Sequence, residues 1–158
     1  MKIITKEAGY LLSYSFSELE KNKQAYPIFF QITKDGKKKT KEFFNFSLEE
    51  SIDKVISLVE AIDDSVIGGG AIFPVETKES KKDKLSPALM SIITTADAQF
   101  HLLQRYKFDK NGKLILEPYK AIYKEGLLSK EVEKLEKYYY QGIMEYKDGR
   151  DIWLRSFS

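Results

Sequence analysis

The segment from Ser47 to Ile62 constrains the fold more than any other part of the sequence, because it has the pattern of an amphipathic helix with its own start signal. Ser47 and Glu50 form a capping box, in which two side chains satisfy free backbone N–H groups at a helix start. Apolar residues then recur at helical spacing at Leu48, Ile52, Val55, Ile56, Val59 and Ile62. A helix with one apolar stripe must bury it, so we expect a second layer of structure beside it.

Two earlier segments alternate apolar and polar residues, which is typical of strands with one face in the core. Their apolar positions are Tyr10, Leu12, Tyr14 and Phe16 in the first, and Tyr26, Ile28, Phe30 and Ile32 in the second. Asp35-Gly36 then favours a tight hairpin turn, since both central residues of a type I′ turn need positive φ. A third strand is expected to run to 43–46, so these patterns predict an antiparallel sheet.

The remainder of the chain predicts further elements of both kinds. In order, we expect a turn at Gly68–Gly70, a strand at 71–75, a charged loop from Lys78 to Lys84, a helix from Ser86 to Leu103, a hairpin at 106–116, a helix from Ser129 to Gly142 and a terminal hairpin at 143–157. The segment 119–126 fits a strand or a helix. The fold class is therefore α+β, with an antiparallel sheet built from hairpins and two or three helices packed on one face, in a single domain spanning 1–158.

Composition excludes several classes of function. The absence of cysteine rules out disulfides, thiolate metal sites and a cysteine nucleophile. Neither a signal peptide nor an apolar run long enough to cross a membrane is evident, so we expect a cytoplasmic protein without membrane contact. Twenty-six Lys and Arg against 24 Asp and Glu leave a net charge of +2, which makes nucleic acid an unfavoured partner.

Catalytic chemistry has little support in the sequence. His101 is the only histidine, and Asp97 precedes it by four residues on the expected helix, so the two side chains are placed to touch. A general base held by a carboxylate has this arrangement, but no nucleophile or metal ligand accompanies the pair. The glycines at 68–70 lack the Lys-Ser/Thr and the helix start of a phosphate loop. We therefore expect no catalytic residue, metal or cofactor.

A lysine cluster marks the expected hairpin tip, at Lys34, Lys37, Lys38, Lys39 and Lys41. Such a basic ribbon can follow phosphates, which leaves weak nucleic-acid binding through 34–41 as an alternative. Charged hairpin tips also prevent edge-to-edge pairing of sheets, and Asp35 and Glu42 dilute the charge here.

Three successive tyrosines, Tyr138, Tyr139 and Tyr140, stand on the last expected helix. Consecutive helical residues point about 100° apart, so one core stripe cannot take all three rings. At least one ring should reach the surface, where tyrosine is a common binding hot spot. Trp153, on the expected terminal strand, is placed in the core.

These observations favour a protein-binding domain without catalytic activity. Its expected contact residues are Tyr138, Tyr139, Tyr140, Lys37, Lys38 and Lys39. Immunity proteins and inhibitors, which cover a partner protein, are small proteins of this kind. The main alternative is a small enzyme or ligand-binding domain with a pocket near His101.

Replacing Val55 tests the placement of the first helix. Val55→Asp would put an unpaired charge among apolar residues and should destabilise the fold by several kcal/mol, on the order of 3 or more. Thermal unfolding followed by circular dichroism measures the loss, and a wild-type midpoint would refute the placement of this stripe in the core.

Overall fold

The computed structural model describes residues 1–78 and 84–158, and in these it has four helices and a seven-stranded antiparallel sheet. The elements in chain order are α1 (Lys2–Asn22), β1 (Ile28–Thr33), β2 (Lys38–Glu42), α2 (Leu48–Glu60), β3 (Val66–Thr77), β4 (Ser86–Thr94), β5 (Gln99–Phe108), β6 (Leu114–Leu116), β7 (Lys120–Glu125), α3 (Ser129–Glu145) and α4 (Lys147–Ser156). The α+β class is confirmed. Most of the predicted charged loop from Lys78 to Lys84 lies outside the described residues.

The sheet grows from local hairpins, and its strands follow the order β2-β1-β3-β4-β5-β6, with β7 also paired to β5. The hairpin predicted at Asp35-Gly36 joins β1 to β2, but of these two residues only Gly36 has a positive φ, 85°, so the turn is not the expected type I′ turn. The predicted hairpin at 106–116 joins β5 to β6, and the ambiguous segment 119–126 forms β7.

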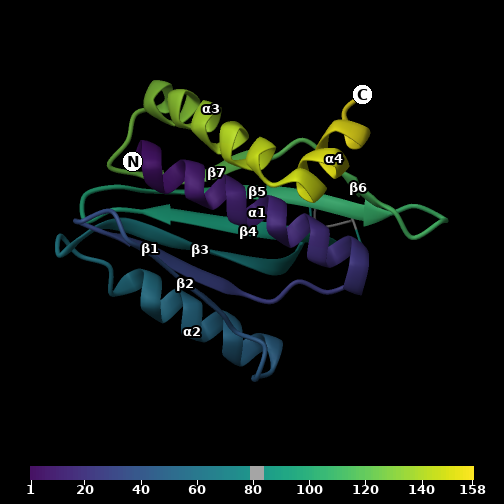
Figure 1. Ribbon diagram of the computed structural model, residues 1–158, viewed down its shortest axis with the longest axis horizontal. Helices are drawn as coiled ribbons and strands as arrows, with labels where there is room; N and C mark the ends of the chain where they lie inside the picture. Colours follow the sequence, from purple (N-terminus) through teal and green to yellow (C-terminus); the bar gives the residue numbers. More distant parts are fainter. Residues whose placement is uncertain (79–83) are drawn as a thin grey trace.

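Helices cover both faces of the sheet (Figure 1), whereas the sequence predicted them on one face only. On one face α2 buries Val55 and Val59 against side chains of β1 and β3, including Phe29 and Phe73. Ser47 Oγ accepts a hydrogen bond of 3.2 Å from Glu50 N, as expected for a helix cap. On the other face lie α1, α3 and α4, with the larger part of the core.

The strand predicted at 10–16 is wrong, because these residues lie in the middle of α1. This helix is buried on nearly all sides, between the sheet and the last two helices, so its serines do not form a wet face. Ser13 Oγ donates 2.8 Å to the Ile143 carbonyl oxygen of α3, and Ser15 Oγ donates 3.0 Å to Leu11 O within the helix. In this helix small polar side chains alternate with large apolar ones, and this alternation has the same period of two as a strand with one buried face.

Two glycines allow α1 and α3 to approach each other at backbone distance. A Cβ on Gly9 would collide with the carbonyl oxygen of Tyr139, and a Cβ on Gly142 would collide with the carbonyl oxygen of Lys6. Any other residue at these points would force the helices apart. Gly142 was expected to end the helix but lies within α3, where the absence of a side chain permits the close contact with α1.

The helix predicted from Ser86 to Leu103 is also wrong, since β4, a turn and the first half of β5 occupy this range. β4 is central and covered on both faces: Leu89 and Ile93 face the larger core, whereas Ile92 packs in the cluster under α2. A strand buried on both faces has a continuous apolar run, which periodicity cannot distinguish from a buried helix.

Two smaller predictions near these elements are corrected as well. The predicted turn at Gly68–Gly70 is part of β3, where bare backbone leaves room for Ile4 of α1 on one side and Ile62 after α2 on the other. The predicted third strand ends at Glu42, before 43–46.

The terminal hairpin predicted at 143–157 is wrong, because α3 continues to Glu145 and α4 follows after a single break at Tyr146. Asp148-Gly149 resembled a turn, but Gly149 is required for packing: a Cβ there would collide with Ser13 of α1. The glycine therefore lets α4 lie against α1.

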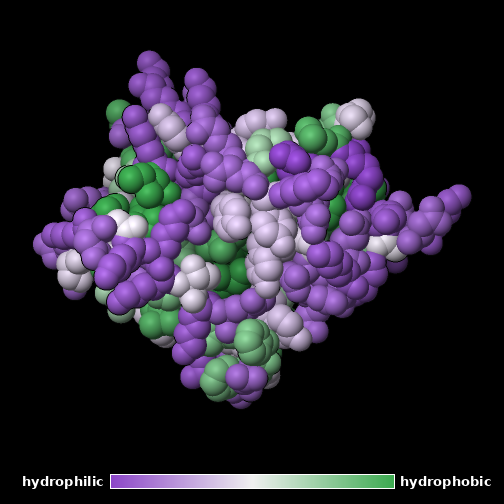
Figure 2. Space-filling view, in the orientation of Figure 1, coloured by the Kyte–Doolittle hydropathy of each residue, from purple (hydrophilic) through white to green (hydrophobic). Residues whose placement is uncertain are grey.

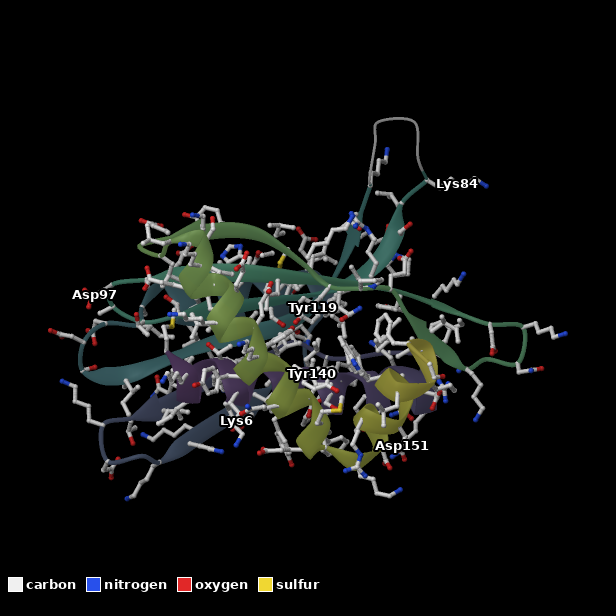
Figure 3. All side chains as sticks on the ribbon, turned by 90° about the horizontal axis from the view of Figure 1, so that it is seen from above. Lys6, Lys84, Asp97, Tyr119, Tyr140 and Asp151 are labelled. Carbon is white, nitrogen blue, oxygen red and sulfur yellow. The ribbon has the colours of Figure 1, made fainter. Side chains whose placement is uncertain are left out.

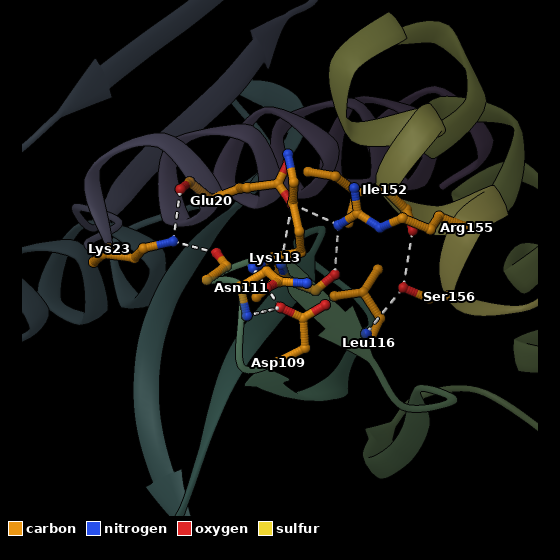
Figure 4. Close-up of polar contacts among 11 residues, drawn as sticks. Glu20, Lys23, Asp109, Asn111, Lys113, Leu116, Ile152, Arg155 and Ser156 are labelled. Atoms are coloured by element: carbon orange, nitrogen blue, oxygen red, sulfur yellow. Dashed lines mark hydrogen bonds and ion pairs between the residues drawn. The ribbon is translucent and has the colours of Figure 1, made fainter.

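A polar cluster fixes α4 to α1 and to β6 (Figure 4). Arg155 Nη2 donates to Glu20 Oε1 over 2.5 Å and to the Leu114 carbonyl oxygen over 2.6 Å. Glu20 Oε1 also accepts from Leu114 N over 3.0 Å, and Ser156 Oγ accepts from Leu116 N over 3.0 Å. Although burial opposes it, the hydrogen bonds to Glu20 from Arg155 and Leu114 keep the pKa of this carboxyl below its ordinary value. Backbone groups of a short strand are thus satisfied by side chains of two helices.

Gly9→Ala tests the close approach of the helices. Alanine favours an isolated helix by about 1 kcal/mol over glycine, but here we expect the collision with Tyr139 O to outweigh this, with a net loss of about 2 kcal/mol or more. Urea unfolding measures the change, and Lys137→Ala, at an exposed position of α3, is the control that should remain near wild type. Stabilisation by Gly9→Ala would contradict the contact.

Candidate partner-binding surface

The three successive tyrosines of α3 have three different environments. Tyr139 is completely buried, and its hydroxyl lies 2.7 Å from Ser91 Oγ on β4. Tyr138 is half-buried, with Lys2 Nζ 5.4 Å from its ring centroid. Tyr140 is 42% exposed. One ring reaches the surface, as helical geometry requires, and Tyr139 is part of the core and unable to contact a partner.

Tyr140 belongs to a cluster of aromatic rings that we call the aromatic patch, made of Tyr119, Tyr140, Trp153 and Phe157. The ring of Trp153 is at its centre, with centroids 6.1 Å from Tyr140, 5.8 Å from Tyr119 and 4.6 Å from Phe157. Phe157 is 41% exposed, and the neighbouring Leu154 is 50% exposed. Figure 3 shows Tyr119 and Tyr140 beside each other near α3, seen from above.

The core holds the rings of the aromatic patch in place. Trp153 stacks on the buried Phe16 of α1, with centroids 6.5 Å apart, and Tyr119 meets the edge of Tyr139 at 5.4 Å. Burial, followed by the nearby Glu136 carboxylate, raises the pKa of Tyr119 to about 12, so its hydroxyl stays protonated near neutral pH. Two rings of the patch thus pack directly on core rings, and the exposed Tyr140 and Phe157 pack against one of them, Trp153.

A shallow hollow of about 500 Å³ adjoins the aromatic patch. Its lining residues are Tyr119, Glu133, Glu136, Lys137, Tyr140 and Gln141. Burial, together with the charge of Glu133, raises the pKa of Glu136 above its ordinary value. Within the part of the chain that the structure describes, no lysine or arginine pairs with Glu133 or Glu136. The hollow therefore offers a basic group an acidic environment beside aromatic rings.

Sequence reasoning singled out Tyr140 but missed the other members of the aromatic patch. Trp153 and Phe157 are four residues apart, which is a helical neighbour spacing that the predicted terminal strand concealed. Glu133 and Glu136 of the adjoining hollow also have a helical neighbour spacing, since they are three residues apart on α3. Tyr119 reaches the other rings of the patch only through the tertiary fold, and no local sequence pattern predicts this contact.

The lysines predicted as contacts lie at a different place, on the β1–β2 hairpin. Lys38 Nζ forms an ion pair of 2.7 Å with the largely buried Glu7 of α1, so this lysine is engaged in the fold. Lys37 Nζ lies 3.8 Å from Asp35, and Lys39 is exposed on β2. Because β2 is at one edge of the sheet and β6 and β7 are at the other, the lysines and the aromatic patch are separate surfaces.

Most of the face seen in Figure 2 is hydrophilic, with small separate apolar areas. One lies near the C terminus, where α4 ends, and another lies over the segment before α2 at the bottom of the view. The latter segment contains Phe44, 56% exposed, and Phe46, 45% exposed. These two rings are a second group of exposed aromatics, in which Phe44 contacts the ring of Tyr26 at 5.9 Å and Phe46 contacts the buried Phe43 at 6.4 Å.

His101 and Asp97 do not form the helical pair expected of them. His101 lies on β5, with Nε2 2.9 Å from Gln99 Oε1 and its ring 4.6 Å from that of Tyr123. Asp97 lies in the exposed turn between β4 and β5. Burial lowers the pKa of His101, which keeps the ring neutral near pH 7. Its contacts are those of a histidine packed on the face of a sheet.

The described ranges 1–78 and 84–158 show neither a cluster of three or more metal-ligating side chains nor a helix able to cross a membrane. No protein family model matches the sequence, and comparisons with curated proteins and with solved structures give no significant match.

His101→Gln tests whether this residue is functional or only packed. Its pKa is lower in the folded than in the unfolded state, so the wild type loses stability as the pH falls below about 6.5. Urea unfolding at pH 7 and pH 5 should show a smaller loss in the variant, because glutamine takes up no proton. Partner affinity should stay within a few-fold, whereas a loss of about 100-fold in a folded variant would place His101 in the functional site.

Proposed function

We propose that this protein acts by binding another protein through the aromatic patch, and that it covers a surface of that partner in the manner of an inhibitor or immunity protein. The observation that supports this most is that Trp153, partly buried against the core, is flanked by the exposed rings of Tyr140 and Phe157. Tryptophan and tyrosine are the side chains most enriched at the energetic centres of protein interfaces.

The rigid packing of the rings supports a binding role for a thermodynamic reason. Association costs free energy when flexible side chains become ordered, and this cost is small for rings already fixed in their bound positions. Trp153 is fixed by Phe16 below it and by three aromatic neighbours around it. Its exposed neighbours, Tyr140 and Phe157, supply contact area without that ordering cost.

The charges beside the patch indicate which partner surface fits it. Glu133 and Glu136 line the adjoining hollow, so a partner residue placed there should be basic. Lys137 lines the same hollow and limits the acidic area to one side of it. The complementary surface would therefore combine an apolar group with a lysine or arginine.

Tyr140→Ala is the variant that tests this proposal, because Tyr140 is exposed and its removal leaves the core intact. Affinity capture from the native host with wild-type protein identifies partners, and titration of a purified partner then measures Kd. We expect Tyr140→Ala to weaken binding by about 2 kcal/mol or more, which is roughly a 30-fold increase in Kd.

Phe44→Ala is the matched control, since Phe44 is an aromatic residue in the segment before α2 that is even more exposed than Tyr140. This variant should bind like the wild type. If the partner instead tolerates Tyr140→Ala and is lost with Phe44→Ala, the contact lies at the second group of aromatics and the proposal is refuted.

A further inference from the structure

β7 is an edge strand with an apolar centre. Among the described residues it pairs with β5 on one side only, so alternate backbone N–H and C=O groups on its other side have no partner strand. All six of its residues are exposed, and Ile122 and Tyr123 are 49% and 44% exposed. A strand with these properties is a ready template for another strand.

The opposite edge of the sheet is protected in a way that β7 is not. The edge strand there, β2, has the sequence Lys-Lys-Thr-Lys-Glu, and closely spaced charges of this kind prevent pairing between sheets. At the centre of β7 the sequence is Ala-Ile-Tyr, and the charged residues Lys120, Lys124 and Glu125 stand only at its ends. The chain therefore blocks one edge and leaves the other available.

A groove runs between β7 and α3. Its volume is about 500 Å³, and its lining residues are Ala121, Ile122, Tyr123 and Lys124 on the strand and Ser129, Val132, Glu133 and Glu136 on the helix. Glu133 and Glu136 also line the hollow beside the aromatic patch. The groove and the hollow thus share a wall at these two carboxylates, and we call the two together the channel, with Tyr119 and Tyr140 in the hollow.

We propose that β7 accepts an extended segment of a partner protein as an additional strand, with a lysine or arginine against Glu133 and Glu136 and an apolar or aromatic side chain against Tyr119 and Tyr140. This inference rests on the proposed function and specifies how the partner binds. Backbone hydrogen bonds to β7 give affinity, and the two side-chain positions give specificity.

The spacing of the channel fits a strand. Glu136 and Tyr140 are four residues apart on α3, which corresponds to about 6 Å along the helix axis. Two residues of an extended chain span about 6.6 Å, and side chains two apart point to the same side. The basic and the apolar residue of the partner should therefore be separated by one residue.

The acidic pair supplies the charge complementarity. Neither carboxylate pairs with a lysine or arginine of the described chain, and both border the groove and the hollow. A basic side chain of the bound segment would favour the ionised form of Glu136, and so would oppose the effects of burial and of Glu133, which raise the pKa of this carboxyl.

A random ten-residue peptide library displayed on phage is the probe that tests this inference with the whole protein. Selected peptides should share a basic and an apolar or aromatic residue two positions apart. A fluorescent version of one selected peptide is then titrated against wild type and variants. Glu136→Lys and Tyr140→Ala should each weaken binding about tenfold or more, because each removes one of the two side-chain contacts.

Glu60→Lys is the matched control, an exposed charge reversal on α2 at the opposite face of the sheet, and it should change binding less than twofold. Ile122→Pro removes a donor from β7 and should abolish binding if the variant still unfolds cooperatively. Amide hydrogen exchange of the wild type needs no variant: bound peptide should protect the amides of β7 that do not bond to β5.

Several outcomes would overturn the inference. Peptides that need Tyr140 but leave the exchange of β7 unchanged would refute strand addition and keep the aromatic patch as the contact. Peptides that protect β7 but tolerate Tyr140→Ala would refute the patch, and with it the proposed function. If no peptide is selected, the partner contacts β7 with a folded surface and not with an extended segment. If the protection of β7 grows with protein concentration alone, the occupant is a second copy of this chain.

Discussion

The fold depends on the contact of α1 with α3 at backbone distance, which Gly9 and Gly142 make possible. Because the helices touch along their main chains, α1 is enclosed between the sheet and α3. This contact also sets the rotation of α3 about its axis. Tyr139 then points inward to Ser91 on β4, and Tyr140, one residue later, points outward. Two residues without side chains thus determine which of three identical side chains is available at the surface.

The second support of the surface is α4, which completes the aromatic patch. Gly149 lets this helix lie against Ser13 of α1, and Arg155 joins it to Glu20 and to the backbone of β6. Trp153 is thereby placed on Phe16, with Tyr140 and Phe157 beside it. The positions of the rings that we propose as the contact therefore depend on the hydrogen bonds of Arg155 and the close packing at Gly149, which both lie outside the aromatic patch.

The sequence predicted those parts of the structure that have local causes. The cap at Ser47, the apolar stripe through Val55 and the turn at Gly36 act within a few residues, and each was placed correctly. Residues 10–16 and 86–103 were assigned to the wrong class because burial on several sides removes the periodicity that separates helix from strand. At the candidate partner-binding surface, the helical period by itself predicted that at least one of the three tyrosines is exposed. Tyr119 and Trp153 could not be added, because tertiary contacts bring them together.

The bond from Ser13 to Ile143 joins residues that are 130 positions apart in the sequence. Closing so long a loop costs conformational entropy before the contact returns any stability, so it forms slowly compared with the hairpins of the sheet. In a growing chain the side of α1 that faces α3 and α4 stays uncovered until these two helices have been made. The aromatic patch consequently forms only after α3 and α4 have been synthesised and have packed against α1.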